Sequence, residues 1–365
     1  MHNGPSTVIR VEPEKGRRTI VVSDIHANLP YFQGLMKKVG FCAEDILVID
    51  GDFLEKGEDS LGMLRYVMEL CRGGNVITVC GNCDDLALVC TFTREFDQYA
   101  LDYNRTKRSG LFWDILLDMG IQPDGDLDFD AIRPEILRRY APEHAFLASL
   151  PHAVEYGRYL FAHAGADPEK PLRDHTVRQL ARCDRFLTLG RRFDRWVVVG
   201  HWPVALYGEN IVSAAPIIDR ESHIISIDGG CVLKDDGQLN ALIIPDAYAD
   251  EFTTAAYDPF PTARVLSDQT GGGRSYYIRW GDSTVQVLER GEEFSRCRHV
   301  RTGYEMDILT KYLFSDGEIT DCNDSTDYVL PLRAGDTVSI VERTSRGYFV
   351  KHDGVSGWYF GALEE

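Results

Sequence analysis

Residues 19–26 read TIVVSDIH, and the change of character within this stretch decides the fold. The run Thr19–Ser23 is short, apolar and β-branched, which is typical of a buried strand. The polar residues Asp24 and His26 follow at once, and a helical pattern then extends from about residue 30 to residue 39. A strand, a polar loop and a helix in this order predict one unit of a layered α/β domain.

The same order recurs along the first 250 residues. Further strand-like runs are Ile46–Ile49, Val76–Cys80, Tyr159–Ala162, Trp196–Val199, Ile224–Ile227 and Leu239–Ile244. A second helix is expected over residues 60–70, and a charged, largely helical stretch over 94–150 reads as an insertion or cap over one edge of a functional site. We therefore expect an α/β domain over residues 1–250, with its functional residues at the ends of the strands.

The pattern changes after about residue 250. Residues 276–288 and 327–360 read as short strands divided by turns. We expect a β-rich connecting region over 251–320 and a small all-β module over 321–365 that resembles an SH3-like barrel. This module either docks an extended peptide or is an accessory barrel that rigidifies or dimerises the protein, and we favour the accessory role.

Composition excludes several classes of function. The 365 residues carry a formal net charge of −18 with no long run of Lys or Arg, so a general nucleic-acid binder is not expected. No apolar run reaches the length of a membrane span, and residues 1–16 lack the core of a secretion signal, so we expect a cytoplasmic protein without membrane partners. The nine cysteines are scattered and odd in number, which indicates reduced thiols.

Side chains that can bind metals follow the strand-like runs. They are Asp24, His26, Asp52, Asn82, His163 in the stretch FAHAG, and His201 in the stretch VVGHWP. Carboxylate, imidazole and amide oxygen are ligands for hard or borderline divalent cations. A single Asp or His at a strand end is most often a cap or a hydrogen-bonding group. Five strand ends that each supply a ligand type indicate a metal site.

The ordered series Asp-x-His, Gly-Asp, Gly-Asn-x-Asp, His-Ala-Gly and Gly-His resembles the calcineurin-like metallophosphoesterases over about residues 19–244. It is most similar to their phosphoprotein phosphatase branch, which includes bacterial and phage protein phosphatases and the symmetrical diadenosine tetraphosphatases. The segment Ser226–Val232 (SIDGGCV) also resembles that branch. The resemblance implies a layered β-sandwich flanked by helices.

The resemblance also implies a dinuclear metal centre. The implied ligands are Asp24 and His26 for the first metal, Asp52 as a bridge to both, and Asn82, His163 and His201 for the second. A hydroxide shared by two ions about 4 Å apart would attack phosphorus in line, without a covalent enzyme intermediate. Two divalent ions are expected, either Mn, Fe, Zn, Co or Mg, with Mn favoured.

One departure from the family lies beside the ligand Asn82. Cys83 stands where most members of the branch have a His, held by a carboxylate, that protonates the leaving oxygen or steadies the transition state. A thiol is a weak donor and would tend toward thiolate near two cations, so leaving groups that need a proton should react poorly. We expect Asp52, Cys83, Asp84 and Lys56 to form the catalytic group.

Cysteine also occupies this position in a phosphodiesterase branch of the superfamily. That branch ends its last motif in Gly-His-x-His, whereas this chain has Gly200–Pro203 (GHWP). Cys80 and Cys83 together form a C-x-x-C pattern, which we interpret as a buried cysteine beside a substituted site residue. The alternatives are a redox pair, a zinc half-site and a metal that prefers sulfur.

The second departure is Lys56. The stretch GDFLEKG over residues 51–57 aligns with the family's Gly-Asp-x-x-Asp-Arg-Gly, in which the Arg grips phosphate. Lysine keeps the charge but lacks the two-pronged guanidinium, so Lys56 is either a phosphate anchor or an exposed loop residue. A second anchor is expected between His163 and His201, where we name Arg182 and leave Arg178 and Arg185 open.

These observations predict a metal-dependent phosphoester hydrolase whose substrate is a phosphoprotein or a nucleotide. A serine/threonine protein phosphatase is the first hypothesis. A phosphodiesterase or nucleotide pyrophosphohydrolase is the alternative that Cys83 favours. Outside enzymes, the alternative is a phosphate-binding scaffold whose SH3-like module recruits partners, and the complete set of ligands argues against it.

Overall fold

The computed structural model describes residues 4–125, 127–317 and 319–364, which form two compact units. The first unit runs up to Pro203 and also includes Pro216–Leu233 and Gln238–Asp258. The second unit contains Val204–Ala215, Lys234–Gly237 and the chain from Pro259 onward.

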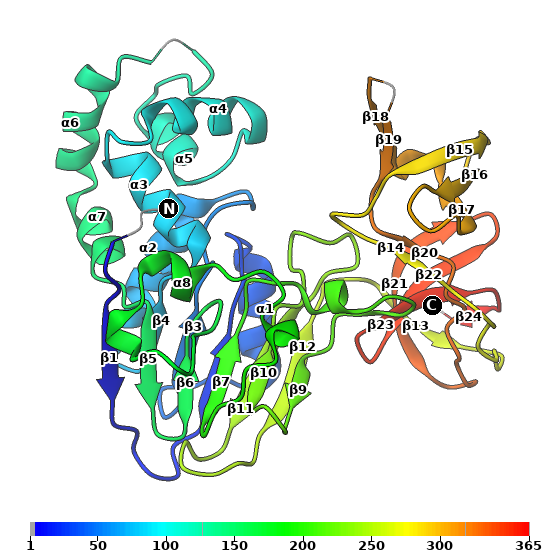
Figure 1. Ribbon diagram of the computed structural model, residues 1–365, viewed down its shortest axis with the longest axis horizontal. Coiled ribbons are helices and arrows are strands. Elements are labelled where there is room, and N and C mark those ends of the chain that lie inside the picture. Colours follow the sequence, from blue (N-terminus) through cyan, green and yellow to red (C-terminus); the bar gives the residue numbers. More distant parts are fainter. Residues whose placement is uncertain (1–3, 126, 318, 365) are drawn as a thin grey trace. The chain divides into compact units, whose positions relative to one another are not determined.

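The first unit is built on two mixed β-sheets (Figure 1). In spatial order, the five-stranded sheet contains β12 (Thr253–Tyr257), β11 (Leu239–Ile244), β2 (Thr19–Val22), β3 (Ile46–Asp50) and β4 (Val76–Val79). The six-stranded sheet contains β1 (Val8–Val11), β5 (Ala153–Tyr156), β6 (Tyr159–Phe161), β7 (Trp196–Val199), β10 (Ile224–Ser226) and β9 (Ile217–Asp219). Strands β2, β3 and β4 are parallel, as are β6, β7 and β10.

An apolar core joins the two sheets. Val21 and Val48 of the first sheet form one buried cluster with Val154, Phe161 and Val198 of the second. These side chains are at most 1% exposed, which explains why their strands read as continuous apolar runs in the sequence. The predicted layered α/β architecture is confirmed.

Eight helices within the described residues pack against the sheets or against one another. They are α1 (Leu29–Val39), α2 (Ser60–Cys71), α3 (Asn82–Phe92), α4 (Asp97–Lys107), α5 (Leu111–Asp118), α6 (Phe129–Arg139), α7 (Ala141–Ala148) and α8 (Val177–Ala181). The helices α4–α7 fall within the expected insertion, and they pack against α2 and α3 (Figure 1). Within the described ranges, every helix is too short or too polar to cross a lipid bilayer.

The second unit is all-β. Its largest sheet contains β24 (Leu363–Glu364), β13 (Thr262–Val265), β21 (Thr337–Thr344), β22 (Gly347–His352), β23 (Val355–Tyr359) and β8 (Val212–Ser213). Smaller sheets contain β14 (Tyr277–Ile278) with β20 (Ser325–Thr326), β15 (Val285–Glu289) with β16 (Phe294–His299) and β17 (Glu305–Leu309), and β18 (Leu313–Asp316) with β19 (Ile319–Cys322). The SH3-like resemblance of this region stays a prediction.

The two units divide the chain differently from the boundaries expected at residues 250 and 320. Strand β12 belongs to the first unit because it pairs with β11 along its whole length. Strand β13 lies between β21 and β24, so the largest sheet of the second unit extends beyond residues 321–365.

A charged clamp fixes the start of β3 beside the end of α1. Arg18 Nε donates to Asp45 Oδ1 at 2.7 Å, and Arg18 Nη2 donates to Asp45 Oδ2 at 2.6 Å. The same guanidinium donates to the carbonyl oxygens of Val39 and Gly40, which end α1.

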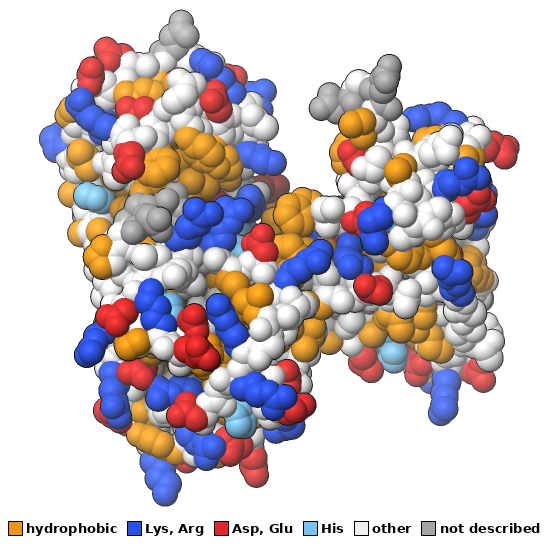
Figure 2. Space-filling view, in the orientation of Figure 1, with side chains coloured by type: hydrophobic (Ala, Val, Ile, Leu, Met, Phe, Trp, Pro, Cys, Tyr) orange, Lys and Arg blue, Asp and Glu red, His pale blue; other side chains and the backbone are white. Residues whose placement is uncertain are grey.

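Elsewhere on the first unit, Figure 2 shows Lys and Arg interspersed with Asp and Glu over its lower half. The clamp differs from these exposed ion pairs because the Asp45 carboxylate is buried and because Arg18 also donates to two backbone carbonyl groups.

We predict that Asp45→Ala lowers the free energy of unfolding by about 2 kcal/mol, because a buried carboxylate loses charge-assisted hydrogen bonds. The hydrogen bond from Arg18 holds the pKa of Asp45 below its ordinary value. The decrease in unfolding free energy is therefore largest above about pH 4, and it becomes smaller as the pH falls through the lowered pKa of Asp45. Urea denaturation at several pH values measures it. In the control Glu12→Ala, which removes an exposed pair with Arg10, the loss stays below about 1 kcal/mol. Equal decreases in the free energy of unfolding for Asp45→Ala and Glu12→Ala would refute the stabilising role given to the clamp.

Candidate metal centre

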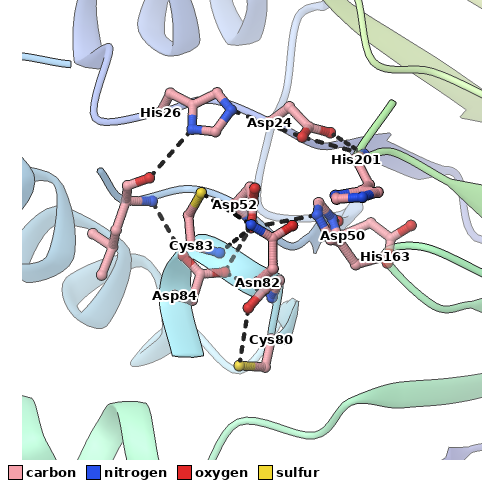
Figure 3. Close-up of polar contacts among 12 residues, drawn as sticks. Asp24, His26, Asp50, Asp52, Cys80, Asn82, Cys83, Asp84, His163 and His201 are labelled. Atoms are coloured by element: carbon pink, nitrogen blue, oxygen red, sulfur yellow. Dashed lines mark hydrogen bonds and ion pairs between the residues drawn. The ribbon is translucent and has the colours of Figure 1, made fainter. Parts of the chain in front are cut away.

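Two groups of donor atoms meet in the first unit, and they share one residue. The ligand atoms of His26, Asp52 and Cys83 lie within 4.8 Å of one another, and so do those of Asp52, His163 and His201. Figure 3 shows these side chains pointing toward one another around Asp52. A carboxylate common to two adjacent groups is placed to bridge two cations.

The parallel strands explain how the donors meet. Asp24 and His26 follow β2, Asp52 follows β3, and Asn82 and Cys83 form the first turn of α3 directly after β4. His163 and His201 follow β6 and β7 of the other sheet. Because the carboxyl ends of parallel strands lie at the same edge of a sheet, loops from both sheets converge on one place.

Backbone carbonyl groups orient two of the histidines. The Nδ1 of His163 lies 2.8 Å from the carbonyl oxygen of Asp50, and the Nδ1 of His26 lies 3.4 Å from that of Leu54. An Nδ1–H that donates to a carbonyl leaves Nε2 as the acceptor, which is the tautomer that binds a metal. His163 Nε2 is buried, lies 3.3 Å from Asp52 Oδ1 and forms no well-aligned hydrogen bond with the described residues.

In His201 the two ring nitrogens have the opposite roles to those in His163 and His26. Its Nε2 lies 3.1 Å from Asp184 Oδ1, so Nε2–H donates to the carboxylate and Nδ1 is free to accept. The side-chain oxygen of Asn82 faces this Nδ1, and only a rotated amide would donate to it, at 2.6 Å. The rotated nitrogen would also donate to the carbonyl oxygen of Ala181 at 3.2 Å. Either this rotation or a cation between the two acceptors satisfies the contact, so the pair fits a second metal position.

Asp52 is held at the centre of the two groups. The backbone N–H of Cys83 donates to Asp52 Oδ1 at 2.7 Å. Burial raises the pKa of Asp52, but His163, His26 and the backbone N–H of Cys83 together lower it more, so the pKa lies below the ordinary value for Asp. The carboxylate is therefore charged and ready to bind cations at neutral pH.

Asp84 holds the backbone around Asp52. Its carboxylate accepts from the N–H groups of Asp52 at 2.8 Å, Leu54 at 3.1 Å and Gly81 at 2.9 Å. Burial raises the pKa of Asp84 to about 7, although these three donors favour the charged form. These contacts let Asp84 hold Asp52 in position, and the catalytic role expected for Asp84 from the sequence stays a prediction.

Asp24 is the predicted ligand that stands outside both groups. Its two oxygens accept from the backbone N–H of His201 at 3.0 and 3.2 Å, and its Oδ1 lies 3.9 Å from His26 Nε2. Burial and the neighbouring Asp228 raise the pKa of Asp24 well above the ordinary value. Several buried carboxylates near one another are costly unless a cation offsets their charge, so Asp24 also fits a metal centre.

Four of the predicted ligands lie on strained backbone. The φ angles are 54° at Asp24, 50° at His26, 51° at Asp52 and 65° at His201, all in the left-handed region. Each such residue costs about 1–3 kcal/mol unless the surrounding structure compensates. Residues held this way cluster at functional sites, and their position here supports a function for this edge of the sandwich.

The glycines in the ligand motifs leave room for the ligands themselves. A Cβ at Gly81 would lie 2.1 Å from Asp52 Oδ1, and one at Gly200 would lie 2.1 Å from Asp24 Oδ2. A Cβ at Gly51 would lie 2.6 Å from His163 Nδ1. The pairs Gly-Asp, Gly-Asn and Gly-His in the sequence therefore reflect close packing of backbone against the site.

Lys56 lies near the first group of donors. Burial lowers the pKa of His26 to about 4, and the positive charge of Lys56 acts in the same direction. Burial also raises the pKa of the Cys83 thiol well above its ordinary value, and Lys56 opposes this effect. Without cations the thiol is therefore protonated, so the thiolate expected from the sequence requires bound metal. Lys56 itself is exposed and could reach a phosphate group.

The predicted arginines lie at or beyond α8. Arg182 is exposed and ends that helix. Burial is the main cause that raises the pKa of Tyr99 in α4, and the charges of Cys83 and Arg182 also act on it. Arg182 therefore lies near Tyr99. The Arg185 guanidinium lies 5.8 Å from the ring centre of Trp202, which directly follows His201. Both remain candidates for the second phosphate anchor.

Three residues near the site were missed from the sequence. Asp50 supplies the carbonyl that orients His163, Asp184 orients His201, and Asp228 lies beside Asp24. Asp228 belongs to the stretch SIDGGCV, whose resemblance to a known branch was the available signal. Asp184 follows no strand or motif, so no pattern in the sequence points to it.

A sequence model of the family described as calcineurin-like phosphoesterase matches residues 17–217. A comparison with curated proteins found no match. Among similar solved structures, a protein proposed to be a diadenosine tetraphosphatase is 21% identical, with 70% of this chain and 99% of that chain covered and a TM-score of 0.44. A metallophosphoesterase from Sphaerobacter thermophilus is 19% identical, with 67% and 89% covered and a TM-score of 0.38. A serine/threonine phosphatase from Saccharomyces cerevisiae, with similarity to human phosphatase PP5, is 15% identical, with 71% and 85% covered and a TM-score of 0.41.

We predict that Gly200→Ala weakens metal binding at least about tenfold, because the new Cβ displaces the Asp24 carboxylate from the backbone N–H of His201. Titration calorimetry with Mn²⁺ on metal-free protein measures the affinity. Gly273→Ala is the control, since a Cβ there meets no atom within 4 Å. Unchanged affinity in Gly200→Ala would contradict the role given to Asp24.

We predict that Asp50→Asn gains stability relative to wild type as the pH rises from about 4 to about 7. Burial raises the pKa of Asp50 to about 7, so the folded wild type loses stability as this carboxyl ionises. The asparagine cannot ionise and lacks that loss. Thermal unfolding of both metal-free proteins at pH 5 and pH 8 tests this, and a difference that is the same at both pH values would refute it.

Proposed function

The chain belongs to the calcineurin-like phosphoesterase family, and on that premise we propose a dinuclear centre that hydrolyses a phosphoprotein or a nucleotide. As a family member it is a metal-dependent phosphoester hydrolase. The observation that carries the proposal is Asp52, whose carboxylate belongs to both groups of donors.

The proposed ligands are assigned by position. The first metal position is formed by Asp24, His26 and Asp52, and the second by Asp52, Asn82, His163 and His201. Two divalent ions held there activate water and neutralise charge on the phosphoryl oxygens. His163 and His201 present a fixed nitrogen because their other nitrogens are hydrogen bonded, and Asp84 keeps the loop of Asp52 in place. Manganese stays the favoured ion on the resemblance alone.

Lys56 and an arginine after α8 are proposed to bind the phosphate. Lys56 is exposed beside His26 and Cys83, so its ammonium can pair with a phosphoryl oxygen at the first metal position. Arg182 at the end of α8, or Arg185 beside Trp202, supplies the second positive charge. Two cationic side chains orient the phosphorus atom for attack.

The choice of substrate depends on the leaving group. Asp84 uses its carboxylate to bind backbone N–H groups, and Cys83 is a poor proton donor. Neither residue is suited to protonate an alkoxide such as that of serine or threonine. This observation favours the second candidate, a nucleotide pyrophosphohydrolase or phosphodiesterase, whose leaving groups are more acidic. A serine/threonine phosphatase remains the first candidate on the family resemblance.

We expect the purified, metal-analysed protein to hydrolyse one class of phosphoester in the presence of Mn²⁺. The panel is an aryl phosphate monoester, an aryl phosphodiester, a phosphoserine peptide and a dinucleoside tetraphosphate. Faster turnover of the phosphopeptide identifies a protein phosphatase, and faster turnover of the diester or tetraphosphate identifies the second candidate. No turnover of any substrate by protein that holds two metals per chain would contradict both candidates.

The variant Asp52→Asn controls for contaminating activity. It keeps the size of the side chain but removes the bridging charge, so kcat should fall at least about a hundredfold on every substrate. Residual turnover equal to that of wild type would refute a shared carboxylate in the mechanism.

A further inference from the structure

The donor group of the first metal position contains a sulfur atom. Cys83 Sγ lies within 4.8 Å of the ligand atoms of both His26 and Asp52, and the Cys83 side chain is only 3% exposed. We propose that Cys83 is a metal ligand, and that the first position therefore prefers Zn²⁺ or another ion with affinity for sulfur over Mn²⁺ or Mg²⁺. This inference rests on the proposed dinuclear centre.

The start of α3 delivers the sulfur to this place. Gly81 is the N-cap of α3, and Cys83 is the second residue of the helix. A side chain in the first turn of a helix leans toward the N-terminus, which here faces the ends of β3 and β4. The backbone N–H of Cys83 meanwhile donates to Asp52 Oδ1, so one residue both holds the bridging carboxylate and places a thiol beside it.

The amide of Asn82 connects the sulfur with the second metal position. Its oxygen faces His201 Nδ1, and in this orientation its nitrogen donates to Cys83 Sγ at 3.3 Å. A rotated amide would instead point its nitrogen at His201 and lose the bond to sulfur. The orientation that suits a cation at the second position is therefore also the one that stabilises a thiolate at the first.

The two positions consequently differ in ligand chemistry. The second is formed by Asp52, Asn82, His163 and His201, all nitrogen or oxygen donors. The first adds sulfur to His26 and Asp52. When the sulfur–metal bond forms, the S–H bond breaks and its proton passes to solvent. Sulfur donors favour Zn²⁺ and Co²⁺, whereas carboxylate and carbonyl oxygens suit Mn²⁺ and Mg²⁺.

The other cysteine of the C-x-x-C pattern is placed differently. Cys80 Sγ donates to the carbonyl oxygen of Gly81 at 3.5 Å, and its side chain is part of the apolar core around α1–α3. Figure 3 shows the Cys80 sulfur pointing away from Asp52 and Cys83. Cys80 is therefore outside the proposed site and provides a matched control.

Cobalt substitution tests the proposal with a readout independent of activity. Metal-free full-length protein is titrated with Co²⁺, and the near-ultraviolet band of thiolate-to-cobalt charge transfer is recorded. We expect the band in wild type and in Cys80→Ser, and its loss in Cys83→Ser with Co²⁺ still bound at the second position. Circular dichroism checks that each variant is folded, and Cys83→Asp provides a second variant that keeps a charged ligand without sulfur.

Metal selectivity gives a second measurement. In Cys83→Ser and Cys83→Asp, affinity for Zn²⁺ at the first position should fall at least about tenfold relative to affinity for Mn²⁺. Two bound Co²⁺ ions per wild-type chain without a charge-transfer band would overturn the proposal and leave the dinuclear centre intact. Failure of wild type to bind any divalent ion would overturn the centre and the proposal together.

Discussion

The buried carboxylate of Asp84 joins the loop after β3 to the start of α3, and the geometry of the whole site depends on this link. By accepting from the backbone of Asp52, Leu54 and Gly81, it fixes two loops that come from neighbouring strands. Asp52 can then lie between the two groups of donors. A carboxylate that satisfies three buried N–H groups is also one that is costly to remove, since each would lose its partner.

The loops around this link have strained backbone conformations at the predicted metal ligands. Asp24, His26, Asp52 and His201 all have positive φ, and glycines pack directly behind three of the ligands. These left-handed conformations occur in the loops that leave β2, β3 and β7, where the ligand side chains lie. The apolar core between the sheets supplies the stability that keeps these conformations in place.

Much of the fold could be predicted because its strands are buried on both faces and read as apolar runs with polar residues at their ends. The β2–His26 and β3–Asp52 segments are examples, and the layered architecture follows from them. The metal ligands themselves stay predictions. Asp184 could not be found, since it meets His201 only through folding. Residues 253–257 mix polar and apolar side chains, so their pairing with β11 depends on tertiary context. The direction of the Cys83 side chain likewise depends on the packing of α3.

The two histidines after β6 and β7 come from one sheet, whereas His26 and Asp52 come from the other. An ion at the proposed second position, where Asp52 and Asn82 come from one sheet and His163 and His201 from the other, would therefore cross-link the two halves of the sandwich, as a removable disulfide would. By thermodynamic linkage, each tenfold rise in free metal above saturation adds about 1.4 kcal/mol per ion to the free energy of unfolding. On the proposed function, metal supply would thus set the equilibrium stability of the folded protein as well as its rate of hydrolysis.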